Sequence, residues 1–339
     1  MKTIKIGSIG LGRLGYEHAK NLATAVPGVQ LAAVCDIDAA RVAQVREELD
    51  VPFGYTDFEE MCRNPELDAI AIVSPSDLHV EHIRIAMENG KHVFCEKPLA
   101  TTVEACQEAE AIVNAHPGLV FMLGFMRRFD KSYLEAKKKV DNGDIGKIIL
   151  VRSYNQDSVA TIESTLKFAP HSGGQFLDMS VHEIDLIRWF TGSEIKNLWG
   201  IGGVFAYDLY RELNDGDNVA AMVQCENEAM GFMFLGRAAA HGSHVETEII
   251  GTKGTLRIAA VPASSHLEVM SQHGVCRECY ADFLERWHDA YVTEMCCFAD
   301  YVRGNGKPEI TAADGTAVSR IAYRCKESFE TGKMLPLFD

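Results

Sequence analysis

The sequence lacks an excess of basic side chains. Its 33 lysine and arginine residues are outnumbered by 48 aspartate and glutamate residues, which gives a formal net charge of −15 at pH 7. Such a charge repels the phosphate backbone of nucleic acids and the anionic surface of membranes. We therefore expect neither nucleic acid nor membrane among the partners of this protein.

Long hydrophobic runs are missing as well. A membrane-spanning helix needs about 20 apolar residues, and the longest apolar runs here, such as residues 69–73, have the length of buried strands. The opening segment MKTIKIGSIG has lysines before apolar residues, as a signal peptide does, but glycines interrupt it and no cleavage site follows. We interpret it as a first strand.

No disulfide framework is apparent in the cysteine pattern. The ten cysteines are scattered through 339 residues, and this pattern fits reduced thiols in the cytoplasm. Cys276 and Cys279 form a single CxxC, but no second pair follows at the spacing of a zinc site. We interpret these two as ordinary thiols, leave their role open, and expect no metal.

The chain has the length of about two domains. Up to residue 125, short β-branched runs alternate with segments of helical periodicity, which is typical of a doubly wound parallel sheet covered by helices. We therefore predict a Rossmann domain over residues 1–125. Its expected strands are 3–10, 29–36, 68–74, 92–95 and 119–124, and its expected helices are 15–25, 39–49, 78–89 and 102–115.

Beyond residue 125 strands follow strands with short turns between them. This rhythm predicts an α+β domain over residues 126–339 with a mainly antiparallel open sheet. The expected strands are 147–154, 218–225, 231–235, 245–250, 255–258 and 266–270, and the expected helices are 128–142, 174–190, 283–301 and 312–330.

The first strand ends in a glycine fingerprint. Gly10, Gly12 and Gly15 form GxGxxG at the start of the first helix, where such a loop holds a dinucleotide pyrophosphate at the helix N-terminus. Asp36 ends the second strand, where a carboxylate accepts hydrogen bonds from the adenosine ribose and repels a 2′-phosphate. The pattern therefore predicts NAD rather than NADP, with Arg41 expected as a solvated helix residue.

Two further segments lie at the carboxyl ends of expected strands, where ligands bind in open α/β sheets. Ser74 and Pro75 follow the strand 68–74, although a helix cap at Ser76 explains this segment equally well. His79 is expected either to face the cofactor or to lie in solvent. Glu96, Lys97 and Pro98 follow the strand 92–95, where Pro98 restricts the backbone of Lys97.

Asp178 and His182 lie four residues apart on an expected helix, and therefore on one helical face. A histidine moves protons near neutral pH, and a neighbouring carboxylate orients its ring. A contact on the helix surface is the alternative. A zinc-protease motif is excluded, because His182-Glu183 is followed by leucine at position 186, where HExxH requires histidine.

Several of these segments together resemble one enzyme family. The chain is similar over essentially its whole length to the glucose-fructose oxidoreductase/inositol dehydrogenase/rhizopine catabolism (Gfo/Idh/MocA) family, and within it to the inositol dehydrogenases. The segments that carry this resemblance are GLGRLG at 10–15, Asp36, SPSDLH at 74–79, CEKP at 95–98, GFMRRFD at 124–130, DNGDIGKI at 141–148, and GGQFLDMSVHEIDLIRWFTG at 173–192.

The resemblance implies a catalytic trio of Lys97, Asp178 and His182, and a second domain whose open sheet supports a homo-oligomer, a tetramer in preference to a dimer. The further substrate contacts that it implies are Arg127, Tyr154, Asn155, Asp157 and His241. Only one of Arg127 and Arg128 is expected to face the pocket, with a solvated pair as the alternative. Taking fingerprint and resemblance together, we expect the cofactor to contact Gly10, Gly12, Arg13, Leu14, Gly15, Asp36, Ile37, Ser74, Pro75, His79, Glu96 and Lys97.

The leading hypothesis is NAD-dependent oxidation of one secondary hydroxyl of myo- or scyllo-inositol to the inosose. His182 would accept the hydroxyl proton, Asp178 would orient it, and Lys97 would stabilise the developing alkoxide. The alternatives are a dehydrogenase of an aldose or related sugar, an NAD-dependent glycosidase, and an NAD-binding regulator without catalysis. Sequence does not select among inositol stereoisomers.

Overall fold

The computed structural model describes residues 2–338. The chain forms two compact units, and it crosses between them three times. The first unit contains the residues up to Asp130 and His288–Ser319, whereas the second contains Lys131–Trp287 and the residues from Arg320 onward. Each unit has its own sheet, and the two are described separately.

A six-stranded sheet forms the centre of the first unit, in the order β3-β2-β1-β4-β5-β6, and all its neighbours pair in parallel. The predicted doubly wound sheet is thereby confirmed. The strands are β1 (Ile4–Ile9), β2 (Val29–Cys35), β3 (Phe53–Tyr55), β4 (Ala69–Ile72), β5 (His92–Glu96) and β6 (Phe121–Gly124). The sequence missed β3, because a strand of three half-buried residues has no readable alternation.

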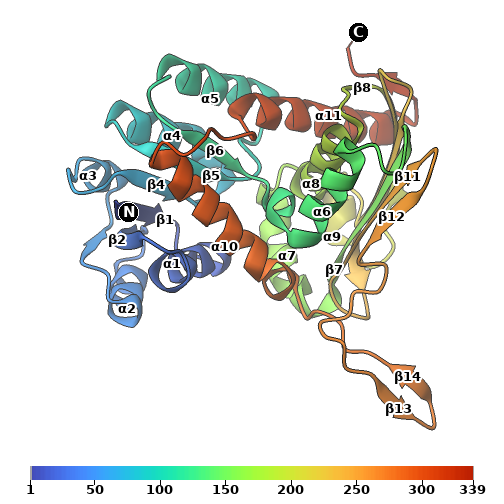
Figure 1. Cartoon of the computed structure of the whole chain (residues 1–339), viewed down its shortest axis with the longest axis horizontal. Coiled ribbons are helices and arrows are strands. Elements are labelled where there is room, and N and C mark those ends of the chain that lie inside the picture. The colour runs from blue at the N-terminus through green and yellow to red at the C-terminus, as the bar shows by residue number, and fades with distance from the viewer. Residues whose placement is uncertain (1, 339) are drawn as a thin grey trace. The chain divides into compact units, whose positions relative to one another are not determined.

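Helices cover both faces of this sheet, with α1 and α2 on one side and α4 and α5 on the other (Figure 1). Three helices begin where a side chain caps free backbone N–H groups, at Asp38, Asp57 and Thr102. The bounds are α1 (Arg13–Thr24), α2 (Ala39–Leu49), α3 (Phe58–Cys62), η1 (Ser76–Leu78), α4 (His79–Glu88), α5 (Val103–Ala115) and the 3-10 turn η2 (Met126–Phe129).

A late segment of the chain belongs to the first unit. Helix α10 (Phe283–Val302) places Met295 and Phe298 in one core cluster with β1, α1 and α2. The contiguous boundary expected after Phe125 therefore does not describe the packing, because residues 288–319 complete the first unit. The sequence did not indicate this return to the first unit, because an amphipathic pattern predicts that one face of a helix is buried but not which core that face contacts.

The second unit is built on a seven-stranded sheet in the order β12-β11-β7-β10-β9-β8-β15. Every neighbouring pair is antiparallel except β10 and β7, which confirms the expected mainly antiparallel sheet. The strands are β7 (Ile148–Ser158), β8 (Ile195–Gly203), β9 (Asn218–Cys225), β10 (Met230–Ala239), β11 (His244–Gly251), β12 (Thr255–Ile258) and β15 (Leu335–Pro336).

Helix α8 (Gln175–Thr191) packs on β7, β9 and β10 and is buried along almost its whole length. The other face of this sheet exposes large apolar side chains, among them Trp199, which is 42% exposed, and Met222, which is 49% exposed. The remaining helices are α6 (Lys131–Asp141), η3 (Val159–Thr161), α7 (Ile162–Phe168), η4 (Ala169–His171), α9 (Leu209–Glu212) and α11 (Ala312–Thr331), whose second half belongs to this unit.

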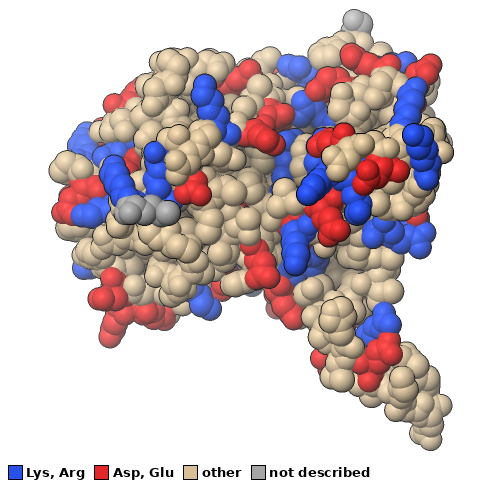
Figure 2. All heavy atoms as spheres, in the orientation of Figure 1, with Lys and Arg blue, Asp and Glu red and all other residues tan. Residues whose placement is uncertain are grey.

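A small hairpin of β13 (Val269–Ser271) and β14 (Gly274–Cys276) projects from the second unit (Figure 1). Its tip carries no acidic or basic side chain in Figure 2, whereas charges of both signs are interspersed over the rest of the visible surface. The strand expected over 266–270 corresponds to β13, shifted by a few residues. Among residues 2–338, no helix has the length and apolarity that crossing a membrane requires.

Helix α10 also carries an unusual carboxyl group into the core of the first unit. Glu294 is fully buried, and neither carboxyl oxygen has a hydrogen-bond partner among the residues that the structure describes. Burial raises the pKa of Glu294 well above its usual value, and the nearby Glu96 carboxylate raises it further. Burial therefore favours the protonated carboxylic acid form of Glu294 in the folded state.

We expect Glu294→Gln to become progressively more stable than the wild type as the pH rises. The pKa of Glu294 is raised in the folded state, so the wild type has the full stability contribution of this carboxyl group at low pH. It loses that contribution as the pH rises from the usual carboxyl pKa to the raised pKa of the folded state. The loss is about 1.4 kcal/mol per pH unit in that window. Urea denaturation of both proteins at several pH values between 5 and 8 measures the difference.

The control is Glu47→Gln, which removes an exposed carboxylate from α2. Its stability relative to the wild type should be nearly independent of pH. A stability difference between Glu294→Gln and the wild type that stays constant over this pH range would show that Glu294 is ionised in the folded protein.

Candidate functional site

The glycine loop between β1 and α1 has the sterics that a dinucleotide loop requires. Gly10 has φ +87°, and a Cβ there would lie 2.5 Å from the carbonyl oxygen of Val73. A Cβ on Gly15 would lie 1.9 Å from the carbonyl oxygen of Gly10. Gly12 differs, because apart from Gly12 and its two chain neighbours no atom of residues 2–338 lies within 4 Å of a Cβ built on it. Two glycines thus close the turn, and the third leaves open space before the N-terminus of α1.

Asp36 is bound to this loop. Its carboxylate accepts the backbone N–H of Leu11 at 2.7 Å and that of Asp38 at 3.0 Å, which leaves lone pairs for a further donor. Arg41 donates from Nε to the carbonyl oxygen of Leu11 at 2.9 Å and stacks on the ring of Tyr16. Arg41 is thus part of the loop's support, not the solvated residue expected. Beside Asp36, Ile37 is 95% exposed.

His79 links two segments at the carboxyl edge of the sheet. Its Nδ1 lies 2.9 Å from the carbonyl oxygen of Pro98, and its Nε2 lies 3.0 Å from that of Ser74. The ring is buried, and this burial lowers the pKa of His79. The solvated alternative is therefore wrong, and His79 holds the loops after β4 and β5 together.

Glu96 points into the first unit, while Lys97 follows directly after β5 at the sheet edge. The Glu96 carboxylate lies 2.8 Å from His18 Nε2 and accepts the backbone N–H of Lys97 at 3.0 Å. Both His18 and Glu96 are buried. The structure thus shows Glu96 fixing the backbone that carries Lys97. After β6, Arg127 and Arg128 are both buried in η2, so the solvated pair is wrong.

In the second unit, α8 carries Asp178 in its first turn and the buried His182 one turn later. The helix begins after Gly173 and Gly174, which have φ values of +78° and +101° that favour glycine. The carboxylate of Asp215 accepts the backbone N–H of Gln175 at 2.6 Å and so caps the helix. These features fix the end of α8 from which Asp178 projects.

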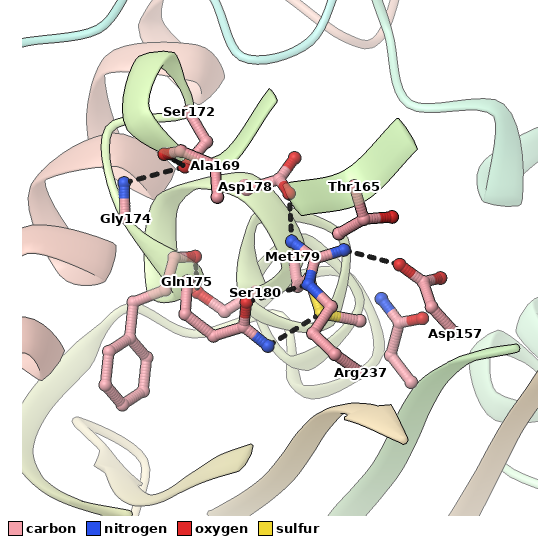
Figure 3. A network of polar contacts seen from close by, with 12 residues as sticks. Asp157, Thr165, Ala169, Ser172, Gly174, Gln175, Asp178, Met179, Ser180 and Arg237 are labelled. Atoms are coloured by element: carbon pink, nitrogen blue, oxygen red, sulfur yellow. Dashed lines mark hydrogen bonds and ion pairs between the residues drawn. The ribbon is translucent and has the colours of Figure 1, made fainter. Parts of the chain in front are cut away.

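An arginine that the sequence analysis did not select lies between two of the expected site residues. Arg237 on β10 donates from its terminal nitrogens to Asp178 and to Asp157, and from Nε to Gln175 Oε1 at 2.9 Å. Figure 3 shows its guanidinium between the two carboxylates. A signal was available, since Arg237 follows Met233 and Leu235 on the inward-facing positions of a strand.

Strand β7 separates the expected substrate contacts onto two faces. Asn155 and Asp157 lie on the face towards α8, where Asn155 Nδ2 is 3.5 Å from Glu183 Oε2. Tyr154 lies on the opposite face, and its ring centroid is 6.1 Å from those of Phe232 and Phe234. The structure therefore does not bring Tyr154 to Asp178, because neighbouring residues of a strand point to opposite sides.

His241 lies in the exposed turn between β10 and β11, where its Nε2 is 3.1 Å from Nδ1 of His244. The expected residues thus form two groups. The first unit contains the glycine loop, Asp36, Ser74, His79, Lys97 and Arg127. The second unit contains Asn155, Asp157, Asp178 and His182. Among residues 2–338, no cluster of three or more His, Cys, Asp or Glu side chains could hold a metal ion.

Comparison with known proteins identifies the family. Residues 4–125 match the oxidoreductase family with an NAD-binding Rossmann fold, GFO_IDH_MocA, and residues 133–257 match the GFO/IDH/MocA C-terminal domain. The chain belongs to the GFO/IDH/MocA family. The predicted resemblance is thereby confirmed.

Within this GFO/IDH/MocA family, similar proteins include inositol dehydrogenases. A scyllo-inositol 2-dehydrogenase (NAD(+)) of Bacillus subtilis is 35% identical over 98% of this chain and 96% of its own. A crystal structure of scyllo-inositol dehydrogenase from Lactobacillus casei with bound NAD(H) and scyllo-inositol has a TM-score of 0.96 and 44% identity, and covers 100% of both chains. A myo-inositol 2-dehydrogenase from Lactobacillus plantarum has a TM-score of 0.96 and 38% identity over 99% of both chains.

The glycine loop allows a paired test of folding against cofactor binding. Gly12→Ala should fold with nearly unchanged stability, because the new methyl group meets no atom of the described chain beyond its own chain neighbours. It should nevertheless weaken NADH binding at least about tenfold by blocking the approach of the pyrophosphate. Gly15→Ala should lose about 1–3 kcal/mol of stability by overpacking. Thermal melts and NADH fluorescence titrations measure both effects. Unchanged NADH affinity in Gly12→Ala would contradict the assignment of this loop.

Proposed function

We propose that this GFO/IDH/MocA protein oxidises one secondary hydroxyl of myo- or scyllo-inositol to the inosose, with NAD as hydride acceptor. The observation that carries the proposal is the group of polar side chains on α8, β7 and β10. Asp178 and His182 lie one turn apart on α8, and Arg237 on β10 joins Asp178 to Asp157 on β7. The similarity to inositol dehydrogenases over nearly the whole chain supports the choice of substrate.

The first unit fits NAD. The open space at Gly12 and the N-terminus of α1 admit a pyrophosphate, and the remaining lone pairs of Asp36 admit the ribose hydroxyls. The carboxylate of Asp36 disfavours the 2′-phosphate of NADP. We propose that Arg13, Leu14, Ile37, Ser74 and Pro75 complete this site, and that Glu96 and His79 contribute by holding its loops in place.

In the proposed reaction the protein residues move the proton and stabilise charge. His182 accepts the hydroxyl proton, Asp178 orients the substrate and the imidazole, and the ammonium of Lys97 stabilises the developing alkoxide. When bound, NAD supplies the nicotinamide ring that receives the hydride from the same ring carbon. The oxidation thus gives a ketone, a hydride on the nicotinamide and one proton. Asn155 and Arg127 are proposed to bind further hydroxyls of the ring, and His241 to contact it from the β10–β11 turn.

The proposal is tested by following NADH absorbance with scyllo-inositol, myo-inositol and glucose in parallel. We expect reduction of NAD with at least one inositol at a higher kcat/KM than with glucose. Activity with glucose alone would identify an aldose dehydrogenase, and inactivity with all three would favour a regulator that binds NAD without chemistry. Either result would overturn the proposal.

Replacement of the proposed base separates chemistry from cofactor binding. We expect His182→Ala to lower kcat about 10²–10⁴-fold, the usual contribution of a positioned proton acceptor. NADH binding should persist, because the glycine loop and Asp36 belong to the first unit. His273→Ala, an exposed histidine on the β13–β14 hairpin, is the matched control and should retain full activity. Wild-type turnover by His182→Ala would exclude the proposed role.

We also propose that the chain forms a homo-oligomer, a tetramer in preference to a dimer, through the open face of its second sheet. Trp199 pairs with Met222 across β8 and β9, and Met222 pairs with Phe232 across β9 and β10, so these side chains share one exposed face. Beside them, Arg152 pairs with Glu246 and Glu248. A contiguous apolar patch rimmed by charges is typical of a protein interface.

Trp199→Glu should weaken this assembly, since it places a charge in the apolar patch. We expect the dissociation constant of the oligomer to rise at least about tenfold, as for a central aromatic residue of an interface. Light scattering after gel filtration measures the mass over a dilution series. Leu134→Glu, which changes an exposed leucine on α6, is the control and should keep the wild-type mass. An unaltered mass for Trp199→Glu would direct the search to another surface.

Finally, we propose a cytoplasmic protein. All ten cysteines are free thiols, and Cys35, Cys62 and Cys325 are buried. Burial raises the pKa of each of these three thiols to about 12, which keeps them protonated and unreactive. A chain with many free thiols fits a reducing compartment.

A further inference from the structure

The second unit contains a buried cation for which the proposed reaction has no assigned role. Arg237 lies on β10, and its side chain is only 6% exposed, whereas those of its partners Asp157 and Asp178 are 23% and 15% exposed. The guanidinium is thus the covered member of the group. The two carboxylates are its more exposed members.

We propose that Arg237 is a positioning residue, which holds Asp157 and Asp178 side by side as acceptors for two hydroxyl groups of the substrate. This inference rests on the proposed function, because it assigns Asp178 and Asp157 to the substrate site. Arg237 does not itself need to touch the substrate. It acts through the two carboxylates that it binds.

The hydrogen-bond geometry supports a positioning role. A guanidinium is a rigid planar fork, so donating to two carboxylates through different nitrogens fixes their relative placement. Asp157 comes from β7 and Asp178 from α8, and Arg237 connects both to β10. A lysine in this place would offer a single point charge, and would not impose the same spacing.

The guanidinium is itself held from behind. Its Nε donates to Gln175 Oε1 at 2.9 Å, and the backbone N–H of Gln175 donates to Asp215 at 2.6 Å. The side-chain amide of Gln175 also reaches the carbonyl oxygen of Asp217 at 3.4 Å. Arg237 is therefore fixed through the same residues that begin helix α8, and cannot rotate without disturbing them.

Charge balance explains why two carboxylates can face the substrate together. Burial alone would lower the pKa of Arg237, but Asp178 and Asp157 raise it more, so the pKa lies above its usual value and the side chain stays cationic. Without this cation, two neighbouring carboxylates would repel each other, and one would take up a proton. A protonated carboxyl donates as well as accepts, and would no longer match a pair of hydroxyl donors.

This arrangement has a consequence for specificity. The group of one guanidinium and two carboxylates carries a net negative charge at its accessible side. It accordingly offers hydrogen-bond acceptors to adjacent hydroxyl groups of a neutral polyol. Arg237 is in this sense a determinant of the substrate class.

The test compares Arg237→Ala, Arg237→Lys and Arg257→Ala in full-length protein. Arg257 forms an ion pair with Glu248 on the open face of the sheet, so its variant removes an equivalent side chain outside the site. The measurements are kcat, KM and the kinetic isotope effect with inositol deuterated at the reacting carbon. NADH binding and a thermal melt establish that each variant folds.

We expect Arg237→Ala to lose about 100-fold in kcat/KM, as for a reacting group displaced by about 1 Å. The isotope effect should increase, since misplaced reactants make hydride transfer slower than the other steps. Added guanidinium ion should raise the activity of Arg237→Ala at least about tenfold, because it refills the space between the carboxylates. It should not raise the activity of Arg257→Ala. Arg237→Lys should fold and show an intermediate loss, which covers the case in which Arg237→Ala does not fold.

Suppose that the wild type oxidises inositol and that the Arg237 variants have the same kcat/KM and isotope effect as the wild type. This result would overturn the role of Arg237 and leave the proposed function intact. A loss that guanidinium does not restore, with an unchanged isotope effect, would also overturn it. A wild-type protein that binds NADH but oxidises no inositol would instead overturn the proposed function, and this inference with it.

Discussion

The second unit depends on one buried ion cluster, in which Arg237 neutralises two carboxylates from different elements. Breaking a buried pair by removing one partner costs about 3–5 kcal/mol, because the remaining charge is left uncompensated. Asp157 on β7 and Asp178 on α8 therefore reach the accessible side of the unit only because β10 supplies a cation beneath them. This contact thus connects the first turn of α8 with β7 and β10 and also supplies the charge that balances its carboxylate.

The first unit uses buried polar side chains in a comparable manner. Its ligand edge consists of loops after parallel strands, and loops have few backbone partners of their own. His79 joins the loops after β4 and β5, Glu96 holds the backbone of Lys97, and Asp36 holds the glycine loop. Each of these residues is close to the proposed cofactor site. Glu96 and His79 hold the loops by hydrogen bonds, and in this way they help to shape the proposed cofactor site.

Local patterns in the sequence predicted the elements whose signals are local. The glycine fingerprint and the strands β1, β2, β4, β5 and β6 depend on neighbouring residues, and the structure agrees with them closely. The helix cap considered at Ser76 is not formed, because a 3-10 turn precedes α4 and neither element has a side-chain cap. Strand β8 escaped prediction because IKNLWGIGG contains asparagine and three glycines, residues that weaken strands. Gly200 is required there by tertiary packing, since a Cβ would lie 2.4 Å from the carbonyl oxygen of Cys325. Tyr154 was expected beside Asp157 because the resemblance to the family implied both, although the period of a strand places the two on opposite faces.

Two pairs of carboxyl groups show why residue type alone does not determine chemistry. Asp157 and Asp178 share a buried guanidinium, so both can remain anionic and accept hydrogen bonds. Glu96 and Glu294 lie in the core of the first unit, where Glu96 has the His18 ring and the Lys97 N–H as partners, whereas Glu294 has no hydrogen-bond partner among residues 2–338 and a raised pKa. The same functional group is thus a hydrogen-bond acceptor at Asp157, Asp178 and Glu96, whereas at Glu294 burial favours the neutral acid. The difference arises because Arg237 on β10 supplies a cation to Asp157 and Asp178, whereas α10 buries Glu294 in the core of the first unit. Neither contact can be inferred from the sequence motifs around these carboxyl groups.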